Sequence, residues 1–268
     1  MSSAFEILAN LLKARSGLML TADKGYLLET RLAPMMRRES LPDLRALAAR
    51  AASMPGSAFE AEIVETMTTG ETLFFRDDKP FVHFREVALP KLALSRPAGV
   101  PLRIWSAASS SGQEAYSLAM ILADELSGFT RRPVRIVGTD LSREKVERAK
   151  EGVYSQFEVQ RGLPQPMLDR HFVREGSGFR ISAALRAVVE FRTFNLLDNL
   201  APLGIFDVVF CRNVLIYFDA PTKSRVLEAI SKRMAPDGLL YLGGAETVIG
   251  LTERFVLEPG TRGVYRLA

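Results

Sequence analysis

An arginine, an asparagine and a tyrosine follow a strongly apolar stretch in the last quarter of the chain. Residues 206–211 read FDVVFC, and Arg212, Asn213 and Tyr217 come soon after them. This run of apolar, β-branched and aromatic residues predicts a buried parallel strand. Ligands of open α/β sheets bind at the carboxyl ends of the strands, so these side chains are candidates for a binding site. Taken alone, the same residues are equally typical of a solvated loop that leaves a strand.

The strand expected at residues 102–107 also ends in residues that suit a binding site. It leads into residues 106–114, SAASSSGQE, whose small side chains allow a ligand to approach the backbone closely. Glu114 lies in the first turn of the next expected helix. A carboxylate there either complements the helix dipole or accepts a hydrogen bond from a ligand ammonium group. It disfavours a pyrophosphate, and no G-x-G-x-x-G fingerprint is present.

Two more expected strands end in polar residues. The strand at 134–141 contains Asp140 near its end, and this carboxylate can accept from both hydroxyls of a ribose. The alternative role, capping the next helix, is less well supported because Ser142 can serve as that cap. Asn195 and Leu196 follow the strand expected at 188–194 and suit the edge and the face of an adenine. Glu114 could accept a hydrogen bond from a ligand ammonium group, and the sequence lacks a loop that would bind a phosphate. Both features favour S-adenosylmethionine over NAD.

The composition limits the class of protein. The chain has 268 residues, 47% hydrophobic and 25% charged, which is typical of a soluble globular protein with one large and one small domain. No apolar run reaches the ~20 residues of a membrane span, and no signal segment is recognisable, so we expect no membrane insertion. The single cysteine, Cys211, fits a cytoplasmic location. Two distant histidines predict no metal site, and a formal charge of +4 does not require nucleic acid.

The first 76 residues predict a small helical bundle. A capping box formed by Ser3 and Glu6 begins the first helix, and Gly17 ends it. Further helices are expected from Thr21, from about residue 40 to 52, and from a second capping box at Ser57 and Glu60. The helix expected from Thr21, the second of the bundle, carries four basic residues that we expect on an exposed side: Lys24, Arg31, Arg37 and Arg38.

From residue 100 onward, strand-like and helix-like segments alternate. Strands are expected at 102–107, 134–141, 188–194, 206–211 and 238–243, and helices at 112–126, 142–150 and 221–234. This alternation predicts an α/β domain with a mostly parallel, Rossmann-like sheet. We therefore expect a helical domain at 1–77, a proline-punctuated linker at 78–97 and an α/β domain at 98–268. A small antiparallel β-subdomain is expected to be inserted at about 160–190.

Several motifs in order resemble the chemotaxis receptor methyltransferases, the CheR family. They are TTGETLFFR at 68–76, WSAA at 105–108, GQEAYS at 112–117, Thr139-Asp140, Asn195-Leu196-Leu197 and FDVVFCRNVLIYF at 206–218. The resemblance covers nearly the whole chain. It implies an S-adenosylmethionine-dependent protein-glutamate O-methyltransferase that esterifies glutamates on the cytoplasmic helical signalling domain of chemoreceptors in chemotactic adaptation and releases S-adenosylhomocysteine.

The resemblance also assigns roles to individual residues. Those implied around the cofactor are Gly70, Thr72, Arg76, Glu114, Asp140, Asn195, Leu196, Arg212 and Asn213. Family members often have Asn where this chain has Gly70, so a side-chain contact is lost there. Arg76 and Tyr217 are implied beside the reacting methyl and the substrate carboxylate. The alternative for Arg76 is a structural ion pair at the domain junction.

Recruitment of the substrate is expected to use the basic side of the second helix, although each basic residue taken alone is more typical of a solvated surface. Pro34 and Met35 stand where related members often carry arginines. The turn at 175–178 is compact, whereas members that bind a C-terminal receptor pentapeptide have a longer loop, so we expect a pentapeptide-independent monomer. Two other functions stay open at this point: a nicotinamide-dependent oxidoreductase and a regulatory module that binds S-adenosylmethionine without turnover.

Overall fold

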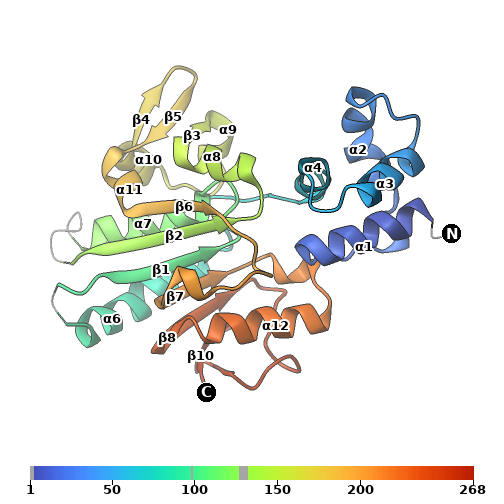
Figure 1. The fold of residues 1–268 in the computed structure, drawn as a ribbon. Coiled ribbons are helices and arrows are strands. Elements are labelled where there is room, and N and C mark those ends of the chain that lie inside the picture. The colour runs from blue at the N-terminus through green and yellow to red at the C-terminus, as the bar shows by residue number, and fades with distance from the viewer. Residues whose placement is uncertain (1–2, 98, 127–131) are drawn as a thin grey trace. The chain divides into compact units, whose positions relative to one another are not determined.

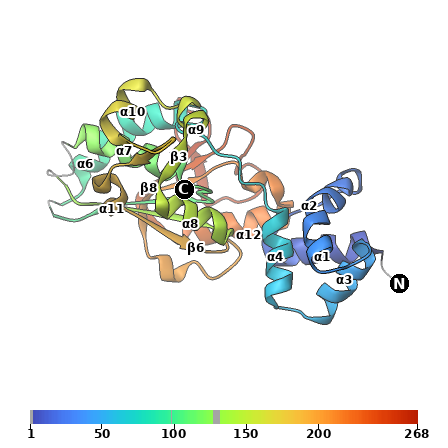
Figure 2. The same ribbon diagram turned by 90° about the horizontal axis from the view of Figure 1, so that it is seen from above.

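The computed structural model of the chain describes residues 3–97, 99–126 and 132–268. The chain forms two compact units (Figures 1 and 2). The helical unit comprises Met1–Thr69 with Tyr217–Lys223, and the α/β unit comprises Gly70–Ile216 with Ser224–Ala268. A late segment of the sequence thus belongs with the first helices.

Four helices build the helical unit, as the sequence predicts. They are α1 (Ala4–Ser16), α2 (Tyr26–Arg38), α3 (Leu44–Ser53) and α4 (Ala58–Met67). The capping box at the start of α1 and the left-handed Gly17 at its end are confirmed. The core consists of apolar side chains at helical spacing that are at most 1% exposed, among them Leu8, Leu12, Leu28, Leu32, Leu47 and Ile63.

Two helix starts and one capping box differ from the prediction. Thr21 precedes a short 3₁₀ turn, Ala22–Lys24, before α2 begins. Helix α3 begins later than expected because Asp43 caps it by accepting the N–H of Ala46 (2.8 Å). The second capping box is wrong in one half. Ser57 accepts the N–H of Glu60, but the Glu60 carboxylate accepts from the N–H of Gly56 (3.0 Å) and pairs with Arg15 instead.

The segment Tyr217–Lys223 is tied to α1 and the loop that follows it. The N–H of Met19 donates to the carbonyl of Tyr217 (2.8 Å), and Lys13 pairs with Asp219 (2.7 Å). Gly17 lies so close to Phe218 that a Cβ at this position would be 2.8 Å from the ring. These contacts explain why the segment belongs to the helical unit.

The α/β unit is built on a seven-stranded sheet in the order β6-β2-β1-β7-β8-β10-β9. The strands are β1 (Leu102–Ala107), β2 (Val134–Asp140), β6 (Val189–Thr193), β7 (Phe206–Cys211), β8 (Met234–Leu242), β9 (Phe255–Leu257) and β10 (Val264–Leu267). The first five are parallel, and β10 is antiparallel to both of its neighbours. The predicted limits of β1 and β7 are confirmed residue for residue.

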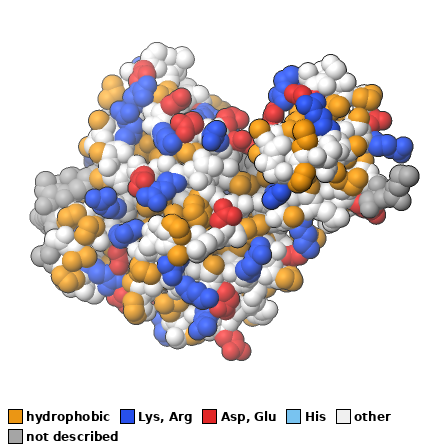
Figure 3. All heavy atoms as spheres, viewed as in Figure 1, with side chains coloured by type: hydrophobic (Ala, Val, Ile, Leu, Met, Phe, Trp, Pro, Cys, Tyr) orange, Lys and Arg blue, Asp and Glu red, His pale blue; other side chains and the backbone are white. Residues whose placement is uncertain are grey.

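Helices cover both faces of this sheet. Helices α7 (Gln113–Glu125) and α6 (Leu89–Ser95) lie on one side, and α12 (Ala220–Ser231) lies on the other (Figures 1 and 2). Helix α8 (Arg143–Glu151) connects β2 to the insertion that precedes β6. Within the described residues, no helix is both long enough and apolar enough to cross a membrane. On the face drawn in Figure 3, the basic side chains of the α/β unit are dispersed among acidic and apolar ones.

The stretch expected as a linker is largely helical. It forms α5 (Lys79–His83), a π-helical turn (Phe84–Ala88) and α6. Five of its apolar side chains, Phe81, Phe84, Ala88, Leu89 and Leu92, are buried in the core of the α/β unit. Phe81 stacks on Phe210 there (ring centroids 5.7 Å apart). Two of its three prolines, Pro80 and Pro90, stand in the first turns of α5 and α6, where a missing N–H costs little.

A small three-stranded antiparallel sheet is inserted before β6, in the order β3-β5-β4. Its strands are β3 (Val153–Ser155), β4 (Phe172–Glu175) and β5 (Gly178–Ile181). It is accompanied by α9 (Gln156–Gln160), α10 (Gln165–His171) and α11 (Ala183–Val188). The predicted β-subdomain is therefore present, although its first strand begins before residue 160.

The burial of residues 79–95 generates a stability prediction. Phe84 is fully buried, so Phe84→Ala should lower the free energy of unfolding of the α/β unit by about 3–5 kcal/mol through the cavity it leaves. Leu94 is 89% exposed in the same segment, so Leu94→Ala should change it by less than about 0.5 kcal/mol. Urea unfolding of both variants measures the difference. Equal, small effects would mean that the segment is a linker after all.

Candidate active site

The order of the parallel strands reverses between β1 and β7. Chain order runs outward from β1 through β2 to β6, and then returns to β7 and β8 on the other side of β1. Ala107 and Cys211, the last residues of β1 and β7, are paired in register. Ligands of open α/β sheets bind in the crevice outside such a switch point. The residues that follow β1 and β7 are therefore the first to consider.

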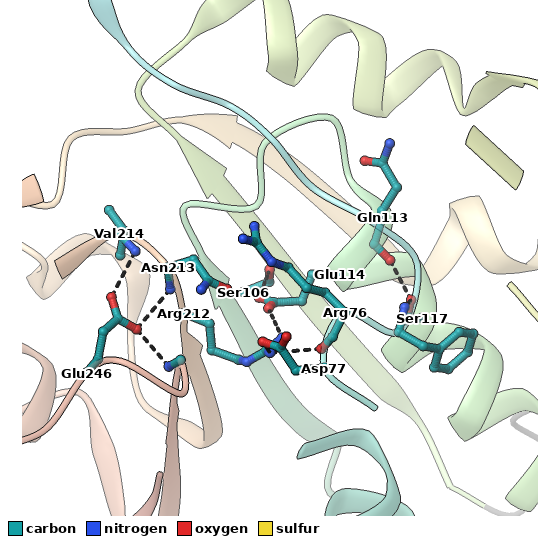
Figure 4. A network of polar contacts seen from close by, with 12 residues as sticks. Arg76, Asp77, Ser106, Gln113, Glu114, Ser117, Arg212, Asn213, Val214 and Glu246 are labelled. Carbon is teal, nitrogen blue, oxygen red and sulfur yellow. Dashed lines mark hydrogen bonds and ion pairs between the residues drawn. The ribbon is translucent and has the colours of Figure 1, made fainter. Parts of the chain in front are cut away.

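A buried ion pair joins these two strand ends. Glu114, in the first turn of α7, is 9% exposed and pairs with Arg212, which directly follows β7 (Oε2 to Nη1, 3.1 Å; Figure 4). The hydroxyl of Ser106 donates to the other carboxylate oxygen (2.8 Å). Burial raises the pKa of Glu114, while Arg212 and Ser106 act in the opposite direction by stabilising the charged form. The charge of Glu114 thus depends on these two partners.

Arg212 also holds the segment that precedes α5. Its Nη2 donates to the carbonyl of Arg76 (2.8 Å) and to the carboxylate of Asp77 (2.8 Å), and its guanidinium lies over the ring of Phe81. The Arg212 side chain is 1% exposed, whereas that of Asp77 is 52% exposed. One buried cation thus links α7, the end of β7 and this segment.

Residues 70–78, which we name the strap, cross the carboxyl ends of the strands. The carbonyl of Gly70 accepts from the hydroxyl of Ser110 (2.7 Å), and the N–H of Phe75 donates to the hydroxyl of Ser117 (3.0 Å). Phe74 is fully buried and packs edge-on against Tyr154 of the inserted sheet (centroids 5.0 Å apart). The strap is therefore fixed to the α/β unit at several points along its length.

The strap carries three of the predicted site residues and backbone strain. Gly70, Thr72 and Arg76 all lie on it, and Arg76 donates through Nη1 to the carbonyl of Glu71 (2.9 Å). Phe75, Asp77 and Asp78 have positive φ angles of 50°, 66° and 47°. Non-glycine residues seldom adopt this region, and such outliers cluster at active sites.

Asp140 organises the loop that follows β1. One of its carboxylate oxygens accepts the N–H of Ser110 (2.8 Å), and the other accepts the N–H of Ser142 (2.9 Å). Ser142 itself caps α8 by accepting from Lys145, so Asp140 is not the helix cap.

The remaining predicted cofactor residues lie on loops after β6 and β7. The side-chain oxygen of Asn195 accepts the N–H of Leu197 (3.0 Å), which forms a local turn, and Leu196 is 8% exposed. Asn213 adopts the left-handed conformation (φ 57°), which asparagine tolerates better than most residues. The α/β unit thus brings Gly70, Thr72, Arg76, Glu114, Asp140, Asn195, Leu196, Arg212 and Asn213 to the carboxyl ends of its strands.

Tyr217 and the four basic residues belong to the helical unit. Tyr217 is half-buried at the end of the 3₁₀ turn Leu215–Tyr217. Two of the basic residues have partners within that unit. Arg31 donates to the carbonyl of Met67 (2.8 Å), and Arg38 binds Glu62 through two hydrogen bonds (2.6 and 2.8 Å). Lys24 and Arg37 are exposed, and no salt bridge to either is found in the described part of the chain.

One acidic residue of this region was missed by sequence reasoning. Glu246 follows β8, and its carboxylate accepts N–H groups from residues 213–216 and from Gly243 (Figure 4). The signal that could have found it is a carboxylate just past the end of the fifth expected strand. Over the described ranges, no group of three or more His, Cys, Asp and Glu side chains is arranged to hold a metal ion.

Two family models together match almost the entire chain. The model described as the SAM binding domain of CheR methyltransferase matches residues 70–264, and the model described as its all-alpha domain matches residues 3–67. The chain belongs to the CheR methyltransferase family. It is accordingly a methyltransferase that uses S-adenosylmethionine, and the predicted cofactor is confirmed.

Named relatives cover nearly the full length. The chain is 39% identical over 265 residues to the chemotaxis protein methyltransferase Cher2 of Pseudomonas putida, which covers 97% of this chain and 96% of the relative. It is 40% identical to chemotaxis protein methyltransferase 1 of Pseudomonas aeruginosa, again over 265 residues that cover 97% of this chain and 96% of the relative. Among solved structures, PKMT2 from Rickettsia typhi in complex with AdoHcy is 15% identical and covers 65% of this chain and 26% of its own, with a TM-score of 0.38.

The polar groups at the switch point fit this cofactor. S-adenosylmethionine has an ammonium group and a ribose, and the site has carboxylates at the end of β2 and after β1. Arg212 Nε and Ser109 Oγ are buried and have no hydrogen-bond partner within the described residues. Buried polar groups are usually satisfied, so a ligand that bonds to these two atoms would complete the site. At Gly138 a Cβ would be 2.5 Å from the Phe191 ring, so only glycine fits there.

The raised pKa of Glu114 generates a pH prediction. If the ionised form of Glu114 holds the cofactor, the affinity for the cofactor is full above the pKa of Glu114 and falls as the pH drops through it. Because this pKa is raised, the loss of affinity should occur at a higher pH than the ~4.3 at which an ordinary glutamate titrates. Calorimetric titration with S-adenosylhomocysteine between about pH 5 and 8 measures this dependence. Glu114→Gln should bind about 10- to 100-fold more weakly and without this pH dependence.

Glu125 on the same helix is the matched control. Its side chain is exposed, so Glu125→Gln should bind S-adenosylhomocysteine like the wild type at every pH. An unaltered pH profile in Glu114→Gln would show that Glu114 serves only the structure.

Proposed function

We propose that this protein transfers the methyl group of S-adenosylmethionine to glutamate side-chain carboxylates of chemoreceptors in the cytoplasm and so forms glutamyl methyl esters. The observation that carries the proposal is the buried Glu114–Arg212 pair, which ties the strap with Arg76 to the switch point of the sheet. The near full-length likeness to named chemotaxis protein methyltransferases supports the receptor as the substrate.

The chemistry needs no metal and no strong base. A glutamate carboxylate is already ionised near pH 7, since its ordinary pKa is about 4.3. S-adenosylmethionine supplies an activated methyl bound to a cationic sulfur, and the carboxylate oxygen forms its bond to this methyl as the carbon–sulfur bond breaks. The protein therefore has to align the reactants and exclude water. These tasks suit a site built of fixed loops and a buried ion pair.

Arg76 is proposed to orient the substrate carboxylate. It uses one of its N–H donors for the carbonyl of Glu71, and a guanidinium has five. The others can hold one carboxylate oxygen while the second remains free to react. Tyr217 is proposed to add a hydrogen bond from its hydroxyl. Substrate contact by these two residues is what makes them catalytic residues in this proposal.

The other predicted residues are proposed to hold the cofactor. Glu114 would accept from its ammonium group and Asp140 from its ribose hydroxyls, while Asn195 and Leu196 would contact the adenine. Gly70, Thr72, Arg212 and Asn213 would line the site through the strap and the loop after β7. The positions of these residues at adjacent strand ends support this assignment.

Transfer of labelled methyl to a receptor signalling fragment tests the proposed function. Arg76→Ala and Tyr217→Phe should lower kcat by about 10- to 1,000-fold and leave the S-adenosylhomocysteine dissociation constant within about threefold, because they act on the reacting groups. Lys79→Ala, an exposed change next to the strap, should retain wild-type turnover. Alkali-labile label on glutamate identifies the ester. A wild-type protein that binds the cofactor but labels no glutamate would instead be a regulatory module.

Recruitment of the receptor is proposed to use the helical unit. Lys24 and Arg37 are its best candidates, because both are exposed and neither has a salt bridge within the described residues. Arg31 and Arg38, in contrast, bind α4, and Arg31 also binds Thr69 beyond it. The β-subdomain is proposed not to bind a receptor pentapeptide. Supporting this, Glu175 pairs with Gly178, so only Gly176 and Ser177 form the turn between β4 and β5.

The double charge reversal Lys24→Glu with Arg37→Glu tests this recruitment. It should raise the receptor KM about 3- to 10-fold, since each surface charge contributes up to about 1 kcal/mol, and the effect should grow at low salt. The control is Arg225→Glu with Lys232→Glu, which changes the net charge equally; Arg225 is exposed on α12 and Lys232 is exposed directly after it. Receptor fragments with and without their C-terminal pentapeptide should give the same KM. A higher KM for the truncated fragment would contradict pentapeptide independence.

A further inference from the structure

Glu246 is the acceptor for an unusual number of backbone N–H groups. Its Oε1 accepts from Val214 (2.9 Å), Leu215 (2.7 Å) and Ile216 (3.3 Å). Its Oε2 accepts from Asn213 (2.8 Å) and Gly243 (2.7 Å). A single carboxylate therefore satisfies four consecutive N–H groups of the loop after β7 and one at the end of β8.

These bonds fix a loop whose first residues line the candidate site. Residues 213–216 begin directly after Arg212, and Asn213 stands in the left-handed conformation (φ 57°). Consecutive N–H groups directed at one anion form a nest, which the anion holds in shape. Without the carboxylate, four N–H donors would lose their shared acceptor, and the loop would have to find another conformation to satisfy them.

The residue at position 243 shows how closely the carboxylate must approach. A Cβ on Gly243 would be 2.7 Å from Glu246 Oε2 and 3.0 Å from both nitrogens of Asn213. The neighbouring Gly244 has no atom within 4 Å of the same position. Neither glycine has a left-handed φ, so backbone conformation does not explain them. The space that the carboxylate requires explains the glycine at position 243, whereas position 244 has room for a side chain.

We propose that Glu246 is a positioning residue for methyl transfer. It touches neither cofactor nor substrate. It holds the loop after β7 so that Asn213 keeps its conformation and Arg212 remains directed at Glu114 and the strap. The kinetic part of this inference rests on the proposed function, but its structural part depends only on the loop and can be measured without any methyl acceptor.

Hydrogen exchange of the protein without cofactor tests the structural part. In Glu246→Gln, an amide N–H₂ group replaces one carboxylate oxygen. This group faces backbone N–H donors and cannot accept a hydrogen bond from them. The amides of residues 213–216 should then exchange at least about 10-fold faster, while those inside β7 and β8 keep wild-type rates. Glu253→Gln, an exposed change in the same connection between β8 and β9, should leave all of them unchanged.

Binding and kinetics test the positioning role. Glu246→Gln should bind S-adenosylhomocysteine more weakly, and its kcat should fall by roughly 100-fold with an unchanged receptor KM, as expected for a misplaced site. Faster exchange throughout β7 and β8, with activity lost only in proportion to unfolded protein, would overturn the proposal in favour of a purely structural role. Wild-type exchange and turnover would overturn it as well.

A pair of glycine variants tests the proposal without removing the carboxylate. Gly243→Ala should displace Glu246 and reproduce the local exchange and the loss of turnover, whereas Gly244→Ala should behave like the wild type. This pair decides the question if Glu246→Gln fails to fold. Equal behaviour of the two alanine variants would refute the inference. A wild-type enzyme that bound the cofactor but transferred no methyl would refute the proposed function alone, since the exchange result would still stand.

Discussion

The architecture of the α/β unit depends on one buried cation. Arg212 contacts Glu114 of α7, the carbonyl of Arg76 and the carboxylate of Asp77, so one guanidinium connects the first helix of the sheet, the end of β7 and the strap. Such a pair is a weak source of stability, because two charges lose their hydration and apolar residues of similar size often do as well. Removing only one partner is costly, however, because the other charge remains buried. The three contacts of Arg212 therefore hold α7, the end of β7 and the strap in one arrangement, which suits a protein that has to align three reacting atoms.

Much of this arrangement could be predicted from the sequence, because parallel strands deliver their last residues to one edge. The limits of β1 and β7 follow from apolar runs alone, and Glu114, Asp140 and Arg212 follow from what stands next to such runs. The failure at 78–97 has a physical cause. The prolines of this stretch suggested a linker, yet Pro80 and Pro90 stand in the first turns of helices, where proline is favoured. The spacing of Phe81, Phe84 and Ala88 already indicated a buried helical face.

Other features could not be predicted because they depend on distant partners. The four basic residues near α2 look alike in the sequence, but Arg31 and Arg38 bind groups on α4 or beyond it. Glu60 fits a capping box by its spacing, yet it serves Gly56 and Arg15. Asp77 and Phe75 give no local sign of their positive φ angles, which the anchored strap imposes on them. In each case the sequence shows the chemical group and the fold selects its partner.

Two carboxylates solve the same problem on either side of the switch point. Asp140 holds the N–H groups of the loop after β1 and the turn into α8, and Glu246 holds those of the loop after β7. Loops at the carboxyl ends of strands have no ladder partners, so their N–H groups need acceptors from elsewhere. Because these acceptors are anions, they also bring negative charge to this edge of the sheet, beside the Glu114–Arg212 pair. A cationic cofactor is then favoured by the same charges that keep the loops in place, and this links the rigidity of the site to its choice of ligand.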